Sequence, residues 1–152
     1  MSTGKGLRGW LRSLVGRRSE PLDAKRADLV VVVSSFDDAE ACSTALERAA
    51  EATPAWQAED EAVLRHHLVL PADTVDRAVE LAGQDGYVVA GTGGGNVPPA
   101  AVVEGAPVIL QRVQVLDALH CAQEKSRMAS LAQRLGGTAL GWDALQPQDA
   151  AG

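Results

Sequence analysis

The sequence is poor in aromatic residues, cysteines and long apolar runs, and each shortage excludes a class of protein. Only five of the 152 residues are aromatic, so a core must come mainly from the alanine, valine and leucine within the 46% apolar content. The two cysteines, Cys42 and Cys121, lack the CxxC spacing of metal and redox motifs, and we expect reduced thiols, with a single disulfide as the alternative. No apolar run approaches the ~18–20 residues that cross a bilayer, and no signal peptide is recognisable. We therefore expect a cytoplasmic protein, with peripheral membrane attachment as the alternative.

Negative charge is missing from the first eighteen residues, which we call the basic segment. This segment carries five positive charges: Lys5, Arg8, Arg12, Arg17 and Arg18. The rest of the chain has 9 basic and 20 acidic residues, a net charge of −11. Because contact with phosphates requires Lys and Arg at the surface, such an acidic body is a poor ligand for nucleic acid. Direct contact with a polyanion is therefore expected only through the basic segment.

The basic segment is also amphipathic. Five apolar residues repeat at the spacing of one helix face: Leu7, Trp10, Leu11, Leu14 and Val15. Three glycines would weaken such a helix by about 1 kcal/mol each, so we expect it to order only on a partner. The alternative is a disordered extension that binds nothing. The candidate contact residues for a protein partner, or for weak binding to an anionic membrane, are Leu7, Arg8, Trp10, Leu11, Arg12 and Leu14.

The remaining sequence predicts one domain between two tails. Residues 1–28 form the basic amphipathic tail and its linker, residues 29–145 a single α+β domain, and residues 146–152 a disordered C-terminal tail. The expected strands have β-branched or alternating apolar patterns: 29–33, 63–70, 87–90, about 107–115 and 138–142. Two expected helices begin with capping signals: one that Ser35 caps and Pro54 stops, and one that Asp73 caps and Gly83 ends. A third, long helix is expected at roughly 116–135, before Gly136-Gly137.

This order of elements predicts the fold. A leading β-α unit is followed by β-α-β and again by β-α-β, with one direct connection between strands. The pattern is typical of a ferredoxin-like sandwich (βαββαβ) with an extra N-terminal β-α unit and the basic amphipathic segment before it.

No group of residues predicts a catalytic, cofactor or metal site. The loop 91–96, GTGGGN, lacks both the helix start of a Rossmann fingerprint and the Lys-Ser/Thr of a P-loop. His66 and His67 are adjacent on a strand, so their side chains leave opposite faces. His66 lies among leucines and is expected to be buried, whereas replacing His67 is expected to change little. His120 beside Cys121 fits no standard zinc spacing.

Four landmarks between residues 65 and 143 resemble one known family. They are the strand Arg65-His66-His67-Leu68, the turn and strand Gly86-Tyr87-Val88-Val89, an apolar strand with a long helix through Met128, Leu131 and Ala132, and the closing Gly141-Trp142. In this order they resemble the regulator of ribonuclease activity B (RraB) family. The resemblance implies an α+β protein that inhibits ribonuclease E by binding it. The chain departs from the family in lacking an acidic C-terminal extension and in having the basic segment and the β-α unit at 29–52.

The sequence therefore predicts a non-enzymatic cytosolic regulator that binds a protein through its acidic body. The resemblance implies a ribonuclease E/G-type nuclease as the partner, whereas charge alone implies only a basic one. Two alternatives remain open. One is a small-molecule-sensing, ferredoxin-like domain of the ACT type with its ligand near the glycine loop, and the other is a membrane-peripheral adaptor that uses the N-terminal helix.

Overall fold

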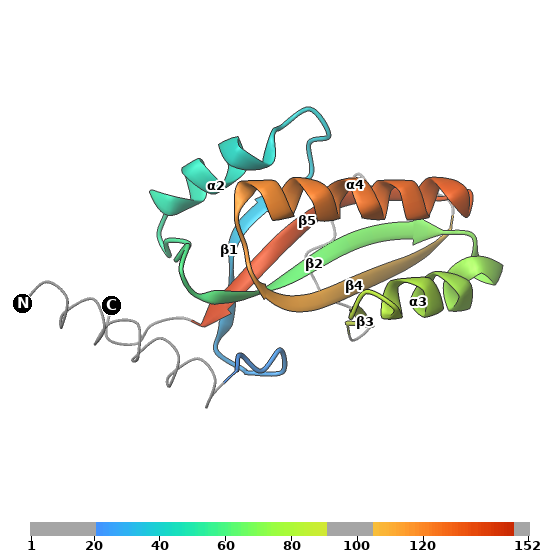
Figure 1. Ribbon diagram of the computed structural model, residues 1–152, viewed down its shortest axis with the longest axis horizontal. Helices are drawn as coiled ribbons and strands as arrows, with labels where there is room; N and C mark the ends of the chain where they lie inside the picture. Colours follow the sequence, from blue (N-terminus) through green and yellow to red (C-terminus); the bar gives the residue numbers. More distant parts are fainter. Residues whose placement is uncertain (1–20, 91–104, 148–152) are drawn as a thin grey trace, which may run out of the picture.

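The computed structural model describes residues 21–90 and 105–147. The basic segment with its candidate contact residues, the glycine loop 91–96 and residues 148–152 lie outside the described residues. The described chain is a mixed α+β structure with an antiparallel sheet and three α-helices (Figure 1). Its elements are β1 (Leu29–Ser35), α2 (Cys42–Ala50), β2 (Glu61–Leu70), the short 3-10 turn η1 (Ala72–Thr74), α3 (Val75–Gly83), β3 (Val88–Val89), β4 (Ala106–Val115), α4 (Ala118–Arg134) and β5 (Thr138–Pro147).

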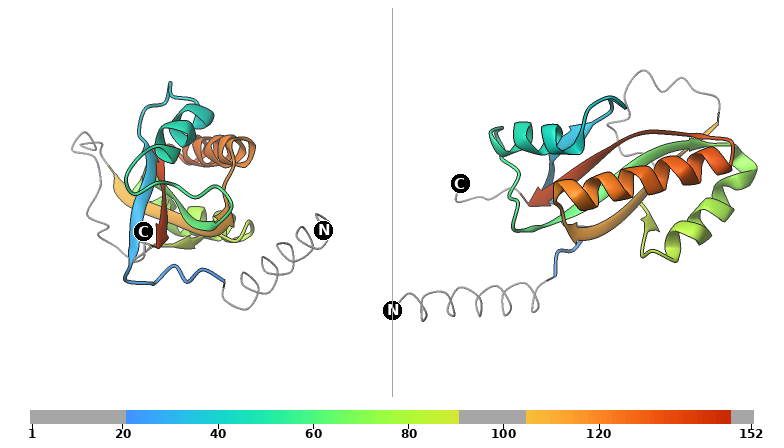
Figure 2. Two further views of the ribbon diagram at one scale, coloured as in Figure 1. Left: turned by 90° about the vertical axis from the view of Figure 1, so that its left-hand side faces the viewer. Right: turned by 45° about the horizontal axis from the view of Figure 1, so that its top comes forward.

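The sheet has five strands in the order β1-β5-β2-β4-β3, and every neighbouring pair is antiparallel. The central strand β2 pairs with β4 along its whole length, from Glu61 opposite Val115 to Leu70 opposite Ala106. The helices α2, α3 and α4 lie on one face of this sheet (Figures 1 and 2). We call this the helix face and the other side the opposite face.

The helix face holds two apolar clusters. The first packs α2 and the beginning of α4 against β1, β5 and the beginning of β2, and it includes Leu46, Leu64, Cys121 and Trp142. The second packs α3 and the rest of α4 against β2 and β4. The alternation predicted for β2 is confirmed, because Leu64 joins the first cluster and Leu68 and Leu70 join the second.

The first helix begins later than its sequence predicts. Ser35 belongs to β1, where it pairs with Trp142, so it does not cap a helix. The helix α2 starts at Cys42, and its N-cap, Ala41, has no side-chain hydrogen bond. The acidic residue Asp37 instead holds the connecting turn, since its carboxylate accepts the Ala39 N–H. Pairing across the sheet therefore outweighs a local capping pattern.

The last strand runs further than predicted, so the expected C-terminal tail is wrong for residues 146 and 147. β5 lies between β1 and β2 and continues to Pro147, which pairs with Leu29. The Gln146 amide is 3% exposed, and it both accepts the Gln57 N–H and donates to the Gln57 carbonyl, each at 2.8 Å. Pairing with β1 and the hydrogen bonds to Gln57 therefore hold residues 146 and 147 in the strand, although the local sequence predicts a tail.

No helix within residues 21–90 and 105–147 is long and apolar enough to cross a membrane.

Candidate functional site

A buried polar layer separates the two apolar clusters on the helix face. It consists of His66 from β2, Tyr87 from the turn before β3 and Glu124 from α4, each no more than 5% exposed. The Tyr87 hydroxyl donates to Glu124 Oε1 at 2.8 Å and lies 3.3 Å from His66 Nε2. On β2 the layer lies between Leu64 and Leu68, which belong to different clusters. The prediction that His66 is buried and packs or forms hydrogen bonds is confirmed.

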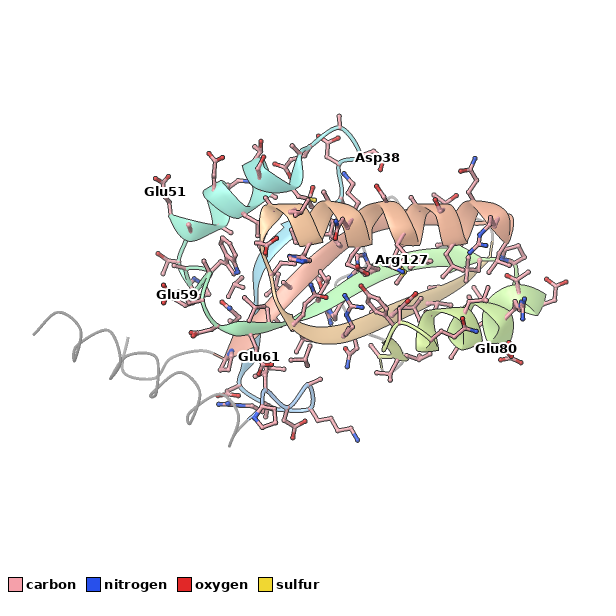
Figure 3. The ribbon with its side chains drawn as sticks, viewed as in Figure 1. Asp38, Glu51, Glu59, Glu61, Glu80 and Arg127 are labelled. Carbon is pink, nitrogen blue, oxygen red and sulfur yellow. The ribbon has the colours of Figure 1, made fainter. Side chains whose placement is uncertain are left out.

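Two arginines close the outer side of this layer. The Arg112 guanidinium lies 3.5 Å from Glu124 Oε1 and stacks 4.6 Å above the centre of the Tyr87 ring. The side chain of Arg127, labelled in Figure 3, lies on α4. It reaches the same oxygen at 3.2 Å and also pairs with Asp85 at 3.1 Å. A buried carboxylate requires such pairing, because desolvation of an unpaired charge is costly.

The protonation states of the layer follow from its burial. Desolvation, together with the positive charge of Arg112, lowers the pKa of His66 to about 3, so this imidazole is neutral at physiological pH. Burial and the hydrogen bond to Glu124 raise the pKa of Tyr87, which keeps its proton. Because that proton points to Glu124, we infer that His66 carries its own proton on Nε2 and donates to the Tyr87 oxygen. The layer is therefore a hydrogen-bonded connection between β2 and α4.

A second polar cluster lies on the opposite face. Asp143 of β5 accepts two hydrogen bonds from Arg65, at 2.7 and 2.6 Å, and lies 3.0 Å from His67 Nε2. Asp143 and His67 are each 2% exposed. Burial would raise the pKa of Asp143, but the hydrogen bonds from Arg65 and His67 and the charge of Arg65 hold it below its usual value. His67 is a buried partner of a buried carboxylate, so the structure removes the basis for expecting that its replacement changes little.

Phe36 and Gly141 fix the position of the His67 ring. The Phe36 ring meets the imidazole edge-on, with ring centres 5.1 Å apart. Gly141 lies beneath Phe36, where an added Cβ would collide with the Phe36 ring and approach the Ser35 carbonyl oxygen to 2.6 Å. A glycine is required here because two strands and an aromatic ring converge on one point.

A His–Asp pair can serve as a general base, but a nucleophile must lie beside it. Within the part of the chain that the structure describes, His67 Nδ1 has no hydrogen-bond partner and no hydroxyl or thiol lies within hydrogen-bonding distance of it. The described residues of this cluster hold two strands together without assembling a nucleophile.

The third histidine lies apart from both clusters. His120 is exposed and pairs with Asp117, whose carboxylate also caps the first turn of α4. The neighbouring Cys121 is buried in the first apolar cluster together with Cys42, and both thiols are free. Burial raises the pKa of Cys121. In the two described ranges, no group of three or more His, Cys, Asp or Glu side chains is placed to hold a metal ion.

An exposed acidic surface lies over α2 and the loop after it. We call three of its exposed carboxylates, Glu47, Glu51 and Glu59, the acidic α2 surface. Figure 3 labels Glu51 and Glu59. Residues 21–90 and 105–147 contain 9 basic and 17 acidic residues, a net charge of −8. Six of the nine basic side chains pair with acidic groups of the same body: Arg26, Arg48, Arg65, Arg77, Arg112 and Arg127. Among the described residues no ion pair reaches Glu47, Glu51 or Glu59, so no described cation compensates their charge.

Two members of the buried clusters were not predicted from the sequence. Glu124 lies three residues after Cys121 and four before Met128, on the apolar stripe of α4, and this spacing could have revealed it. Asp143 follows Gly141-Trp142, but its partner Arg65 is 78 residues away, and no local pattern connects them. Asp143, the more buried of the two carboxylates, could therefore not be predicted, because its partner is distant in sequence.

Comparison with known proteins returns no matching family model, no matching curated protein and no matching solved structure.

Proposed function

We propose that this protein is a non-enzymatic regulator that binds a basic segment of another protein through the acidic α2 surface. Its partner is a ribonuclease E/G-type nuclease, as the resemblance to the RraB family implies. The proposal includes the fold: β2 to β5 with α3 and α4 form a ferredoxin-like βαββαβ unit. The strand order β5-β2-β4-β3 and the helices on one face support this assignment.

The landmarks that carry the resemblance belong to connected parts of the structure. Arg65 and His67 bind Asp143, His66 contacts Tyr87, and Trp142 is buried in the first apolar cluster. Gly86 adopts a positive φ of 86° in the turn that leads to Tyr87. These are requirements of folding, so the landmarks support a shared architecture and leave the partner surface to other residues.

The uncompensated charge of the acidic α2 surface is the observation that carries the proposed binding. Arg48, the nearby cation on α2, is occupied by Glu40 and by the Ser34 carbonyl. Lys125 of α4 donates to the carbonyls of Asp38 and Glu40. Because the nearby cations already have partners, Glu47, Glu51 and Glu59 present negative charge to an incoming molecule. Complementary charge of this kind accelerates encounter and selects basic partners.

The test measures binding of a purified ribonuclease E-type nuclease, and inhibition of its RNA cleavage, by two charge-matched triple variants. The first is Glu47→Gln, Glu51→Gln, Glu59→Gln on the acidic α2 surface. The second is Asp73→Asn, Asp76→Asn, Glu80→Gln around α3, at the far end of the molecule (Figure 3). Both remove three negative charges. We expect the first to lose binding and the second to keep it.

Equal loss in both variants would assign binding to net charge alone, and no binding by the unaltered protein would reject the nuclease as partner. Specific binding of a small metabolite would instead favour the ACT-type alternative. Flotation with anionic vesicles that requires residues 1–18 would favour the membrane-peripheral adaptor.

The absence of enzymatic turnover is a further part of the proposal. The His67–Asp143 pair lacks a neighbouring nucleophile among the described residues, and His66 is held neutral inside the core. We expect the purified protein alone to leave RNA and simple ester substrates intact. Hydrolysis that disappears in His67→Gln would contradict this expectation.

A further inference from the structure

The two cysteine thiols lie together in the first apolar cluster, although they are far apart in sequence. Cys42 is the first residue of α2, and Cys121 lies in the first turn of α4. Their side chains are 6% and 1% exposed, and both thiols are free. Burial raises the pKa of Cys121, and a hydrogen bond with the Cys42 thiol raises it further. The two sulfur atoms are therefore neighbours in the core.

A separate contact holds the segments that carry these thiols against each other. Lys125 lies one helical turn after Cys121 on α4. Its ammonium group donates to the carbonyl oxygens of Asp38 and Glu40, each at 3.2 Å. Because Glu40 lies two residues before Cys42, this cation fixes the turn that leads into α2 to the side of α4. The approach of the two segments is thus set by the backbone as well as by the thiols, as a disulfide requires.

The beginning of α2 is the part that must open for a reagent to reach this pair. Its N-cap residue, Ala41, makes no side-chain hydrogen bond to the first turn. A helix end without such a cap is less stable, and segments of this kind open locally without unfolding of the whole domain. Cys42 is also the less buried of the two thiols. We therefore expect Cys42 to react first and Cys121 to react only with a sulfur that already lies beside it.

We propose that a low-molecular-weight disulfide oxidises Cys42 and Cys121 to an intramolecular disulfide that fastens α2 to α4. The Cys42 thiol loses its proton and attacks the reagent, which forms a mixed disulfide and releases one reagent thiolate. The Cys121 thiol then loses its proton and attacks the sulfur of Cys42, which releases the second thiolate. The cysteines lose two protons and two electrons, and the reagent takes them up as two thiols. This modification goes beyond the proposed function and needs no protein partner.

The experiment incubates the reduced full chain with oxidised glutathione and then blocks any remaining thiols with N-ethylmaleimide in denaturant. Mass spectrometry of the intact protein should show the loss of two hydrogen atoms and no maleimide adduct. Proteolysis without reductant should yield a peptide pair that joins Cys42 to Cys121, and dithiothreitol should restore both thiols. Amide hydrogen exchange should be slower in α2 after oxidation. The control helix α3 has the same length and packs in the second apolar cluster, so its exchange should slow less.

Two matched alanine substitutions complete the test. Cys121→Ala should stop at a mixed disulfide with one glutathionyl group on Cys42, whereas Cys42→Ala should gain no adduct, because Cys121 is the more buried thiol. The main result comes from the unaltered protein and does not depend on how these variants fold.

Three results for the unaltered protein would overturn the proposal: an unchanged mass, a persistent glutathionyl adduct, or disulfide-linked dimers in place of the intramolecular bond. A disulfide that leaves the exchange of α2 at its reduced rate would overturn the fastening of the helix. No nuclease is present, so the outcome is independent of the proposed function.

Discussion

His66 and His67 are neighbours on β2, yet they belong to two polar clusters in which the buried carboxylate is paired differently. On the helix face, His66 meets a neutral hydroxyl, and two arginines balance the one acidic group of its cluster. On the opposite face, His67 shares a buried carboxylate with a single arginine. The first cluster holds α4 to the sheet, and the second holds β2 to β5. A pair of adjacent histidines therefore indicates here a strand that is buried on both faces, with a separate polar connection on each.

The largest expected effect comes from the opposite face. Asp143→Ala leaves Arg65 and His67 without their shared carboxylate in the contact between β2 and β5, where His67 is buried. Removing one partner of a buried ion pair costs about 3–5 kcal/mol. Urea unfolding followed by circular dichroism should show this loss. The control Asp85→Ala removes a carboxylate from a half-exposed ion pair with Arg127 and should cost under about 1 kcal/mol. Equal losses in the two variants would remove the distinction between buried and surface pairs.

The next largest effect is expected from acid, which should lower the stability through His66 before it acts through Asp143. His66 has a folded pKa of about 3 against 6.5 when unfolded, so between these values the unfolded state binds the extra proton. Stability that is fully present above pH 6.5 is therefore lost as pH falls. Because a tenfold change in proton affinity corresponds to about 1.4 kcal/mol, the difference between the two pKa values gives a loss of a few kcal/mol. Asp143, whose folded pKa is also depressed, adds its loss only near and below pH 4.

The variant His66→Gln isolates the first part of this acid response. Its amide keeps a donor for the Tyr87 oxygen but does not titrate. Unfolding free energies measured between pH 6.5 and 4.5 should therefore fall less steeply in the variant than in the unaltered protein. An unchanged slope would show that His66 is not the group that takes up the proton.

Tyr87→Phe should have a smaller effect. It removes the hydroxyl between His66 and Glu124, while Arg112 and Arg127 remain to pair with Glu124. The loss of one buried hydrogen-bonding group costs about 1–3 kcal/mol. Thermal unfolding by calorimetry measures this cost. A loss as large as that of Asp143→Ala would mean that the arginines depend on the hydroxyl for their positions.

The parts of this fold that local patterns determine could be predicted from sequence. The alternation of Leu64, His66 and Leu68 identified the helix face of β2 and placed the two histidines on opposite sides. The order of strands and helices followed from apolar runs separated by turns. These features depend on neighbours within a few residues, which the sequence shows directly.

The parts of the fold that depend on long-range strand pairing could not be predicted from the sequence. Ser35 has the spacing of a helix cap, but its pairing with Trp142 extends β1 instead. Gln146 has the polar neighbours of a tail, but it belongs to β5, where it pairs with Val30 of β1. Its side-chain amide donates to the carbonyl of Gln57, in the loop before β2. Asp143 and Arg65 meet only because β5 lies next to β2. Each of these features depends on which strands become neighbours, and the local sequence does not encode that choice.

The central claim is that the buried clusters serve folding while the acidic α2 surface serves binding. The most direct measurement titrates a ribonuclease E-type nuclease with two variants below their unfolding temperatures: Tyr87→Phe and the triple variant Glu47→Gln, Glu51→Gln, Glu59→Gln. We predict that Tyr87→Phe, although less stable, binds and inhibits like the unaltered protein, whereas the triple variant folds normally and loses binding. Loss of binding in Tyr87→Phe, with normal binding in the triple variant, would contradict this claim.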